Sequence, residues 1–526
     1  MEKTRTENVA KNVLYSTIFQ FIAYVLGFIS RTIFIKILGS EYLGLNGLFT
    51  NILTLLSFAE LGIGSAIVYS MYKPLATKDN KKLKQLINFY KKTYLTIGLT
   101  VIIGSIIFIP FLDFFIKEAP DIKENLVIIY LMFAFNTAIS YFFSYKTSII
   151  SADQKNYLII VYNKTAKIIA IIAQIIVIYN THNYYLYLLI EIISTIMVNV
   201  LLYIKSNKMY PELKNTDNEE LPLEEKKMIT RNIKSLIIYK IGGVALNGTD
   251  NLIISKYLGL AVGGIYSNYQ LLVNAVTEIV GQITGSFTAS IGNLNSIADK
   301  EKKEKVFYKI LYFTYLLFGI CSISLLNILN DVVYIWLGEK YVLSFFTVLM
   351  IVGHFYVNGV QYASFSYRNT LGLFKEAKLG PIIATILNIV LSIILAKKIG
   401  LSGIFMATII ARFLSYGIID PIVVYKTEFK KSSKIYYFKY FIYLFYVTIT
   451  FLIVNFITSF IPKTNLIYIF IKGIISALIS FLMLILLTIK SEEYQGLKEN
   501  FKQIFEKIKL KINSRRKYEK NPNNSI

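Results

Sequence analysis

Ionisable side chains inside long apolar stretches are the residues of this sequence that are best placed to do chemistry. A charge inside a bilayer costs about 3 kcal/mol even on lenient insertion scales, so each needs a partner or a water-filled cavity. Lys472 lies near the end of its stretch, where we expect its amine to reach the membrane surface, and Glu191 is similar but deeper. The other candidates are Arg31, Glu60, Lys164, Lys167, Lys240, Asp250, Glu278 and Arg412.

Two roles are open for these side chains. In the first, the cations pair with Glu60, Asp250 and Glu278 as internal salt bridges that hold two halves of the protein together. In the second, the surplus of cations gives a central cavity a positive potential, which suits an anionic substrate such as a phosphate or diphosphate. Deep carboxylates also serve as proton or sodium sites in transporters, so the same three acids are candidate ion-coupling residues.

The elements that must position these residues are membrane-spanning helices. A bilayer core of about 30 Å needs roughly 20 apolar residues in a helix. The chain has 526 residues, of which 55% are hydrophobic and 17% charged. Its apolar stretches predict an all-α integral membrane protein with about 14 transmembrane helices. The stretches cover residues 12–38, 42–70, 93–117, 125–147, 157–179, 183–204, 232–257, 262–292, 307–330, 341–366, 379–397, 401–425, 436–461 and 465–489.

A polar interval divides the stretches into two groups. We expect an N-terminal six-helix bundle over residues 1–205, a cytoplasmic linker over 206–231 and a second six-helix bundle over 232–425. Two further helices over 426–489 form an appended hairpin, and a basic cytoplasmic tail follows over 490–526.

A weak internal repeat is consistent with two related bundles. The segment Lys36–Gly44 is similar to Lys256–Gly264. Each copy is followed by a long helix and then by a Lys-rich amphipathic loop, from Lys78 and from Lys300. The two copies are about 220 residues apart, as expected for pseudo-symmetric bundles related by an axis along the membrane normal. Chance recurrence of a Leu-Gly turn is the alternative.

The placement of the basic residues predicts the orientation. The chain has 56 Lys and Arg against 32 Asp and Glu, which gives a net charge of +24. With the N-terminus inside, about 42 basic residues fall in cytoplasmic segments and about 8 in external ones, in accord with the positive-inside rule. Both termini are therefore expected in the cytoplasm. The stretch from Tyr494 to Ile512 is expected to form an amphipathic helix on the inner leaflet.

Several function classes are excluded or disfavoured. Nucleic acid is not an expected partner, because the basic residues that bind it would have to share one face, and here the apolar stretches separate them. The only cysteine, Cys321, permits neither an intrachain disulfide nor a Cys-based zinc cluster. No P-loop is present, so ATP hydrolysis of the Walker type is not expected. We predict no cofactor and no metal, but coupling to H+ or Na+ remains open.

Four segments carry a resemblance to a known family. An N-terminal basic segment, then Leu38–Gly44 and Glu60–Gly64, and then the polar Lys73–Lys84 loop resemble the polysaccharide flippases of Wzx type. These belong to the MATE-like multidrug/oligosaccharidyl-lipid/polysaccharide exporter superfamily. The likeness covers nearly the whole chain in span count, topology and repeat, whereas its local motifs are loose.

The resemblance implies a function in the bacterial inner membrane. The protein would transfer an undecaprenyl-diphosphate-linked oligosaccharide from the cytoplasmic to the outer leaflet, for O-antigen (lipopolysaccharide), capsule or exopolysaccharide. The substrate-binding role that the family gives to cavity cations would fall, by depth, to Arg31, Lys164, Lys167, Lys240 and Arg412. Expected partners are membrane lipids and the polymerase and chain-length proteins of the pathway.

Three alternatives remain. A MATE-type drug or ion antiporter would favour an acidic cavity, whereas this chain has surplus base. A lipid II flippase shares the diphosphate and is not separated by composition. A membrane glycosyltransferase or polymerase would need a sizeable external loop, and the longest one expected here, from Asp113 to Glu124, is short.

Overall fold

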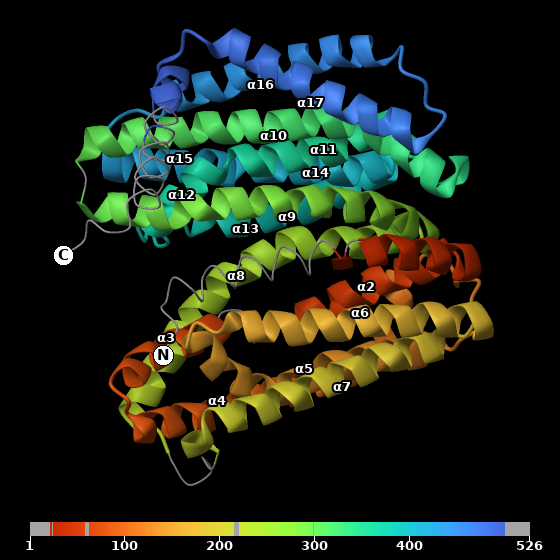
Figure 1. Cartoon of the computed structure of the whole chain (residues 1–526), viewed down its shortest axis with the longest axis vertical. Helices are drawn as coiled ribbons and strands as arrows, with labels where there is room; N and C mark the ends of the chain where they lie inside the picture. The colour runs from red at the N-terminus through yellow and green to blue at the C-terminus, as the bar shows by residue number, and fades with distance from the viewer. Residues whose placement is uncertain are drawn as a thin grey trace, which may run out of the picture. The chain divides into compact units, whose positions relative to one another are not determined.

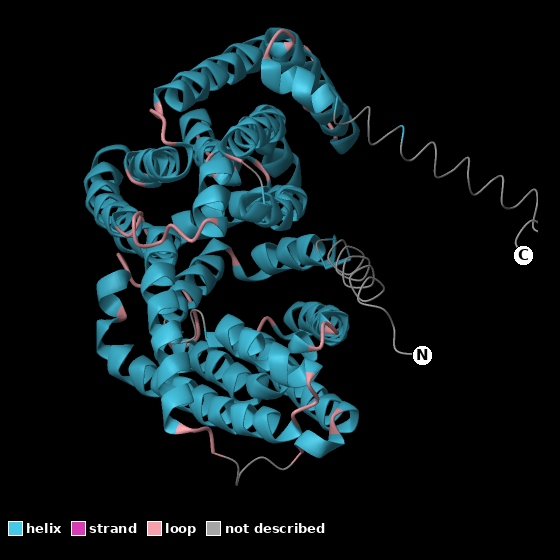
Figure 2. Cartoon of the chain, turned by 90° about the vertical axis from the view of Figure 1, so that its left-hand side faces the viewer, coloured by secondary structure: helices cyan, strands magenta, loops and turns pink. Residues whose placement is uncertain are grey.

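The computed structural model describes residues 22–23, 25–57, 63–214, 220–297, 299–499 and 506. These residues are almost entirely helical, and Figure 2 shows no strand among them. The described part of the chain therefore confirms the all-α prediction. The predicted amphipathic tail helix, from Tyr494 to Ile512, lies mostly outside the described residues.

The chain packs into two compact units. The first comprises residues 1–271 and 381–408, and the second comprises residues 272–380 and 409–526. The boundary runs through three helices, α9 (Leu260–Ile297), α13 (Leu379–Ile399) and α14 (Leu401–Leu414), so each contributes residues to both units.

The first unit begins, in its described part, with a helix over residues 25–38. Figure 1 shows α4, α5, α6 and α7 running side by side, and contacts join α4 to α5, α5 to α7 and α6 to α7. The helices that begin in this unit are α2 (Ser40–Leu56), α3 (Ile63–Ala76), α4 (Asn80–Phe108), η2 (Ile109–Phe111), η3 (Asp113–Phe115), α5 (Leu126–Ala152), α6 (Asn156–Thr181), α7 (Tyr184–Met209), η4 (Pro211–Leu213), α8 (Leu223–Tyr257), α9 (Leu260–Ile297) and α14 (Leu401–Leu414).

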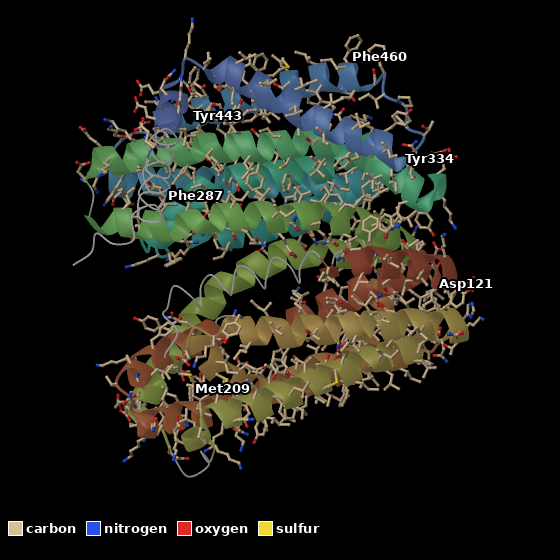
Figure 3. All side chains as sticks on the ribbon, viewed as in Figure 1. Asp121, Met209, Phe287, Tyr334, Tyr443 and Phe460 are labelled. Carbon is tan, nitrogen blue, oxygen red and sulfur yellow. The ribbon has the colours of Figure 1, made fainter. Side chains whose placement is uncertain are left out.

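The second unit is built around the long helix α10 (Lys300–Leu337). This helix contacts α11 (Phe345–Val360), α12 (Tyr362–Thr370), α16 (Lys434–Thr458) and α17 (Leu466–Thr488). Tyr443 of α16, labelled in Figure 3, stacks on Tyr315 of α10 with ring centroids 4.2 Å apart. The remaining helices are α10 (Lys300–Leu337), η5 (Glu339–Tyr341), α11 (Phe345–Val360), α12 (Tyr362–Thr370), α13 (Leu379–Ile399, almost all of it in the first unit), α15 (Tyr416–Val424), the π-helix η6 (Tyr425–Phe429), α16 (Lys434–Thr458) and α17 (Leu466–Thr488).

The lengths of the helices and their exposed apolar surfaces are those of a membrane-spanning protein. Among the described residues, nine helices are long and apolar enough to cross a membrane. Large apolar side chains of α16 and α17 stand exposed, among them Phe438, Phe456 and Phe470. A soluble protein rarely exposes so much apolar surface, whereas lipid covers it at no cost. The protein is thus a multi-pass membrane protein, as predicted.

Two sequence expectations about helix limits are wrong. The Lys-rich segments after Lys78 and from Lys300 are not loops, because α4 begins at Asn80 and α10 at Lys300. Asp79 and Asp299 cap these helices, accepting hydrogen bonds from the backbone N–H of Lys82 (2.9 Å) and Lys302 (2.8 Å). An N-cap carboxylate satisfies an amide that would otherwise have no partner, so each helix extends beyond its apolar stretch.

The two copies of the sequence repeat adopt the same local structure and pack against each other. Gly39 and Gly259 both have positive φ, at 91° and 97°, immediately before α2 and α9. A Cβ on Gly44 would overlap the backbone carbonyl of Leu260. Its counterpart, Gly264, would overlap the carbonyl of Ser40 in the same way. The beginnings of α2 and α9 therefore cross with direct backbone contact, which only glycine allows. We call this contact the glycine crossing.

The glycine crossing predicts a position-dependent effect of alanine within α9. Gly264→Ala should lower the free energy of unfolding by about 2 kcal/mol or more, because the helices must separate. Gly281→Ala is the matched control in the same helix, since a Cβ there meets open space. Alanine should stabilise that position by about 0.5–1 kcal/mol. Thermal unfolding of the full chain in nanodiscs measures both, and equal effects would contradict the crossing.

Candidate functional site

The predicted site residues fall in both compact units, and each unit is described by itself. Glu60 lies outside the described residues, and Lys240 lies in a part of α8 whose side chains are outside them. Glu278 is an exposed residue of α9 in the second unit. The other candidates are Arg31, Lys164, Lys167 and Asp250 in the first unit and Arg412 in the second.

Arg31, in the helix over residues 25–38, binds only neutral side chains in the described part of the chain. Its Nε donates to Oδ1 of Asn268 at 2.9 Å, and its Nη2 donates to the hydroxyl of Ser267. Both partners also donate to the carbonyl oxygen of Gly264, at 3.2 Å and 2.6 Å. The glycine crossing thus holds the groups that orient Arg31, and no carboxylate of the described residues forms an ion pair with the guanidinium.

Lys164 and Lys167 share α6, as the spacing predicts, but they differ in surroundings. Lys164 is partly buried, whereas Lys167 forms an ion pair with Glu191 of α7, with Nζ and Oε1 2.7 Å apart. Gln174 donates to the other oxygen of Glu191 at 3.1 Å. Lys167 therefore adds little to any positive potential, because its charge is balanced.

A cavity of about 510 Å³ lies among α2, α5, α6 and α7 of the first unit. Lys167 and Glu191 form part of its wall, together with Asn46, Thr50 and Asn136. A cavity of this size has room for water, and a water-filled cavity allows polar side chains to exist at membrane depth.

Asp250 of α8 is buried, with 7% of its surface exposed, among neutral polar groups. The Thr408 hydroxyl lies 3.4 Å and 3.5 Å from its two carboxylate oxygens. The Asn388 amide donates to that hydroxyl at 2.8 Å, and the Thr249 hydroxyl lies 3.1 Å from Oδ1 of Asn388. Within the described residues, no cation pairs with Asp250. Oxygen atoms around a lone carboxylate are the ligands that a proton or a hard cation requires.

Arg412 in the last turn of α14 is the corresponding cation of the second unit. Its Nε and Nη1 are buried and have no hydrogen-bond partner among the described residues. The guanidinium lies 5.9 Å from the ring centroid of Tyr416. The neighbouring His354 has a buried Nε2 that also has no partner there. Buried donors without partners are rare, so this site is one where an external acceptor would be favoured.

Arg368 and Asp420, which the sequence reasoning missed, form a second centre beside Arg412. Nη1 of Arg368 lies 2.9 Å and 2.8 Å from the two oxygens of Asp420, and Arg368 is fully buried. Asp420 lies within a predicted apolar stretch, so the sequence alone could have identified it as a buried acidic residue. Arg368 lies two residues beyond the end of a predicted apolar stretch, so the sequence pattern does not indicate that it is buried. This pair is neutral, so it serves packing rather than attraction of an anion.

A helix break positions these residues. α14 ends at Leu414 and α15 starts at Tyr416, with Ser415 at φ −106° and ψ −89° between them. Pro421 inside α15 has no N–H, so the carbonyl of Gly417 loses its helical donor. The Tyr437 hydroxyl lies 3.3 Å from that carbonyl and 2.9 Å from the carbonyl of Ile418. Irregular backbone at membrane depth is tolerated only where it is buried in protein or lines a water-filled cavity.

The prediction that the Lys472 amine reaches the membrane surface is wrong. It is buried, and its Nζ lies 2.6 Å from a carboxylate oxygen of Asp331 in α10. Lys463 approaches the other oxygen at 3.3 Å. A carboxylate within reach makes burial of the ammonium cheaper than extension to the interface. Asp331 directly follows a predicted stretch and was therefore not counted as deep.

Comparisons with known proteins agree with this architecture. A family model described as polysaccharide biosynthesis protein matches residues 9–288. Lipid II flippase MurJ, in an inward closed conformation, has a similar structure, with a TM-score of 0.65, 16% identity and coverage of 90% of this chain and 99% of MurJ. No curated protein sequence matches significantly.

Two further solved structures share the fold. An inward-facing multidrug resistance MATE family transporter of the MOP superfamily has a TM-score of 0.64 and 13% identity, over 80% of this chain and 99% of that one. A MOP superfamily transporter from Pyrococcus furiosus has a TM-score of 0.53 and 13% identity, over 82% and 98%. At these identities the likeness establishes the fold alone, which is the predicted MATE-like one.

The buried ion pair predicts a large cost for a conservative change. Asp420→Asn should lower the free energy of unfolding by about 3–5 kcal/mol, because Arg368 is left buried without a counter-charge. The double replacement Arg368→Met with Asp420→Leu should restore most of the lost free energy of unfolding, because no charge is then left buried without a partner. Glu304→Gln, which breaks the more exposed pair with Lys431, is the control and should cost less than about 1 kcal/mol. Thermal unfolding measures the stability of each variant. If Asp420→Asn costs no more stability than the Glu304→Gln control, the buried Arg368–Asp420 ion pair is contradicted.

Proposed function

The chain belongs to the polysaccharide biosynthesis protein family, and we propose on that premise that it is a flippase for undecaprenyl-diphosphate-linked oligosaccharides. It moves repeat units from the inner to the outer leaflet of the bacterial plasma membrane by alternating access along a cationic path. The product feeds O-antigen, capsule or exopolysaccharide synthesis, with a polymerase and chain-length proteins acting next. The observation that carries the proposal is the charge of Arg31 and Arg412, for neither of which the described part of the chain shows an ion pair with a carboxylate; Asp420, near Arg412, is paired with Arg368.

A diphosphate is the anion that fits such residues. Guanidinium groups match phosphate oxygens in a bidentate way, and hydrogen bonds between two charged groups are roughly twice as strong as neutral ones. The Nε and Nη1 of Arg412 are two buried donors without a hydrogen-bond partner among the described residues, so each is open to a phosphate oxygen. Arg31 keeps its charge beside amide and hydroxyl groups, which a phosphate oxygen can replace. A drug cation, by contrast, would be repelled at both positions.

The membrane potential favours this direction of transport. A potential of about 100 mV, negative inside, is worth about 2.3 kcal/mol for each charge that crosses it. A diphosphate with roughly two negative charges therefore gains on the order of 5 kcal/mol in moving outward. Export needs no ATP on this account.

Ion coupling, if present, is proposed to use Asp250. Its carboxylate and the Thr408 hydroxyl supply oxygen atoms in one place, the Asn388 amide orients that hydroxyl, and no cation of the chain competes for these oxygens within the described residues. Binding of H+ or Na+ there would neutralise a buried charge, so the ion would favour one conformation over another.

The proposal predicts a loss of transport on removal of either cation. Arg31→Gln and Arg412→Gln should each reduce flipping of lipid-linked oligosaccharide roughly ten- to hundredfold, because one charged hydrogen-bonding partner of the diphosphate is lost. Lys431→Gln, at an exposed lysine, is the control. A leaflet assay in proteoliposomes measures the rate.

The same assay separates the competing functions. Recovery of the lipid-linked sugar unchanged supports a flippase, whereas a new glycosidic bond would identify a glycosyltransferase or polymerase. Equal rates with lipid II and with the oligosaccharide substrate would favour a lipid II flippase. Normal transport by both arginine variants would overturn the cationic path.

The coupling proposal predicts that Asp250→Asn transports without responding to an imposed Na+ or H+ gradient. The carboxylate is replaced by an isosteric neutral amide, so no ion charge is balanced there. Transport of the parent and variant is compared with and without each gradient. Glu278→Gln is made in parallel, and a selective loss of the response in that variant would move the coupling site to α9.

A further inference from the structure

The cavity of the first unit is chemically different from the two arginine sites. It measures about 510 Å³, within the range of small-molecule pockets. Thr50 and Asn136 are part of its wall, and each lies about ten residues, or roughly 15 Å, from the first residue of its helix, α2 or α5. That distance is about half the thickness of a bilayer core, so both side chains lie near the middle of the membrane. The Lys167–Glu191 ion pair is balanced, so the wall has no net charge from these two groups.

The wall both donates and accepts hydrogen bonds. The hydroxyls of Thr54 and Ser57 donate to carbonyls of their own helix, at 2.7 Å each, so their lone pairs remain as acceptors. Oδ1 of Asn136 is a buried acceptor without any partner in the described part of the chain. A ligand that satisfies Asn136 must therefore bring a donor, and a fully ionised diphosphate diester has none.

Aromatic rings complete the wall. Phe133, Tyr141 and Tyr187 line the cavity beside the polar groups. Tyr187 is held in place by Tyr184, whose ring is stacked at 5.9 Å, and by the edge of Phe34 at 5.1 Å. Flat rings next to mixed donors and acceptors suit a molecule with apolar C–H faces and a rim of hydroxyls.

We propose that this cavity binds an uncharged sugar residue of the lipid-linked oligosaccharide, apart from the groups that bind the diphosphate. A sugar hydroxyl or acetamido N–H donates to Asn136, its oxygens accept from Lys167, and its C–H face covers an aromatic ring. This inference rests on the proposed function, because it names the part of that substrate which the first unit selects.

Transport of two substrates tests the proposal. Asn136→Leu should reduce flipping of lipid-linked oligosaccharide roughly tenfold, because a sugar donor then faces an apolar side chain. Flipping of undecaprenyl diphosphate without sugar should be unchanged. Asn163→Leu is the matched control, since Asn163 of α6 is exposed and donates to the carbonyl of Ile159. A loss with both substrates, or with neither, overturns the sugar site.

Protection of a single cysteine gives a second measurement that does not depend on transport. Thr50→Cys in a Cys321→Ser background places the only thiol of the full chain in the cavity wall. Oligosaccharide released from the native carrier lipid should slow its reaction with a methanethiosulfonate reagent, and inorganic diphosphate should not. Equal protection by diphosphate, or no protection by the oligosaccharide, contradicts the proposal.

The two proposals fail separately. If the oligosaccharide protects the thiol but the Arg31→Gln and Arg412→Gln variants transport normally, the diphosphate role is wrong and the sugar site stands. If those variants lose transport but the thiol is unprotected, the flippase stands and the sugar site is wrong.

Discussion

Direct backbone contact between α2 and α9 is the constraint on which the first unit depends. Helices pack this closely only where both lack a Cβ, so Gly44 and Gly264 determine how the two copies of the repeat meet. Gly264 also accepts hydrogen bonds from Ser267 and Asn268, the residues that bind Arg31. A contact that makes the packing possible therefore also places a cation. In a membrane, where apolar side chains gain little from leaving lipid, such close contacts carry much of the specificity of the fold.

Charges inside the helices divide into two kinds by their partners. Arg368 with Asp420, Lys472 with Asp331 and Lys167 with Glu191 are balanced pairs. Such pairs roughly compensate the cost of burial and leave no attraction for a ligand. Arg31 and Asp250 contact only neutral groups among the described residues, and Arg412 shares the nearby Asp420 with Arg368, which forms the hydrogen bonds to it. The burial of these three charges must therefore be compensated by something outside the chain or by water. Partner chemistry, and not depth alone, separates the residues expected to bind from those that hold helices together.

Sequence reasoning could predict whatever depends on local pattern. Apolar runs located the helices, and Leu38–Gly44 with Leu258–Gly264 revealed the repeat, since hydropathy and turn residues are local signals. Pairing is not local. The partner of Lys472 stands on α10, far away in the chain, and the partner of Arg368 stands beyond a helix break at Ser415. The Lys-rich starts of α4 and α10 were misread because a capping aspartate extends a helix past its apolar part.

A lipid-linked sugar presents two unlike surfaces, and a transporter gains from binding them at different places. A diphosphate only accepts hydrogen bonds, so it requires donors and positive charge, as at Arg412. A sugar both donates and accepts, so a cavity of balanced charge holds it better than a strongly cationic one, which would favour any anion equally. Under the proposed function, separate sites would let the arginines accept the carrier common to many substrates, while the walls around Asn136 would distinguish among the sugars it bears. Specificity can then change by substitutions within one unit, without weakening the attraction for the diphosphate that every substrate needs.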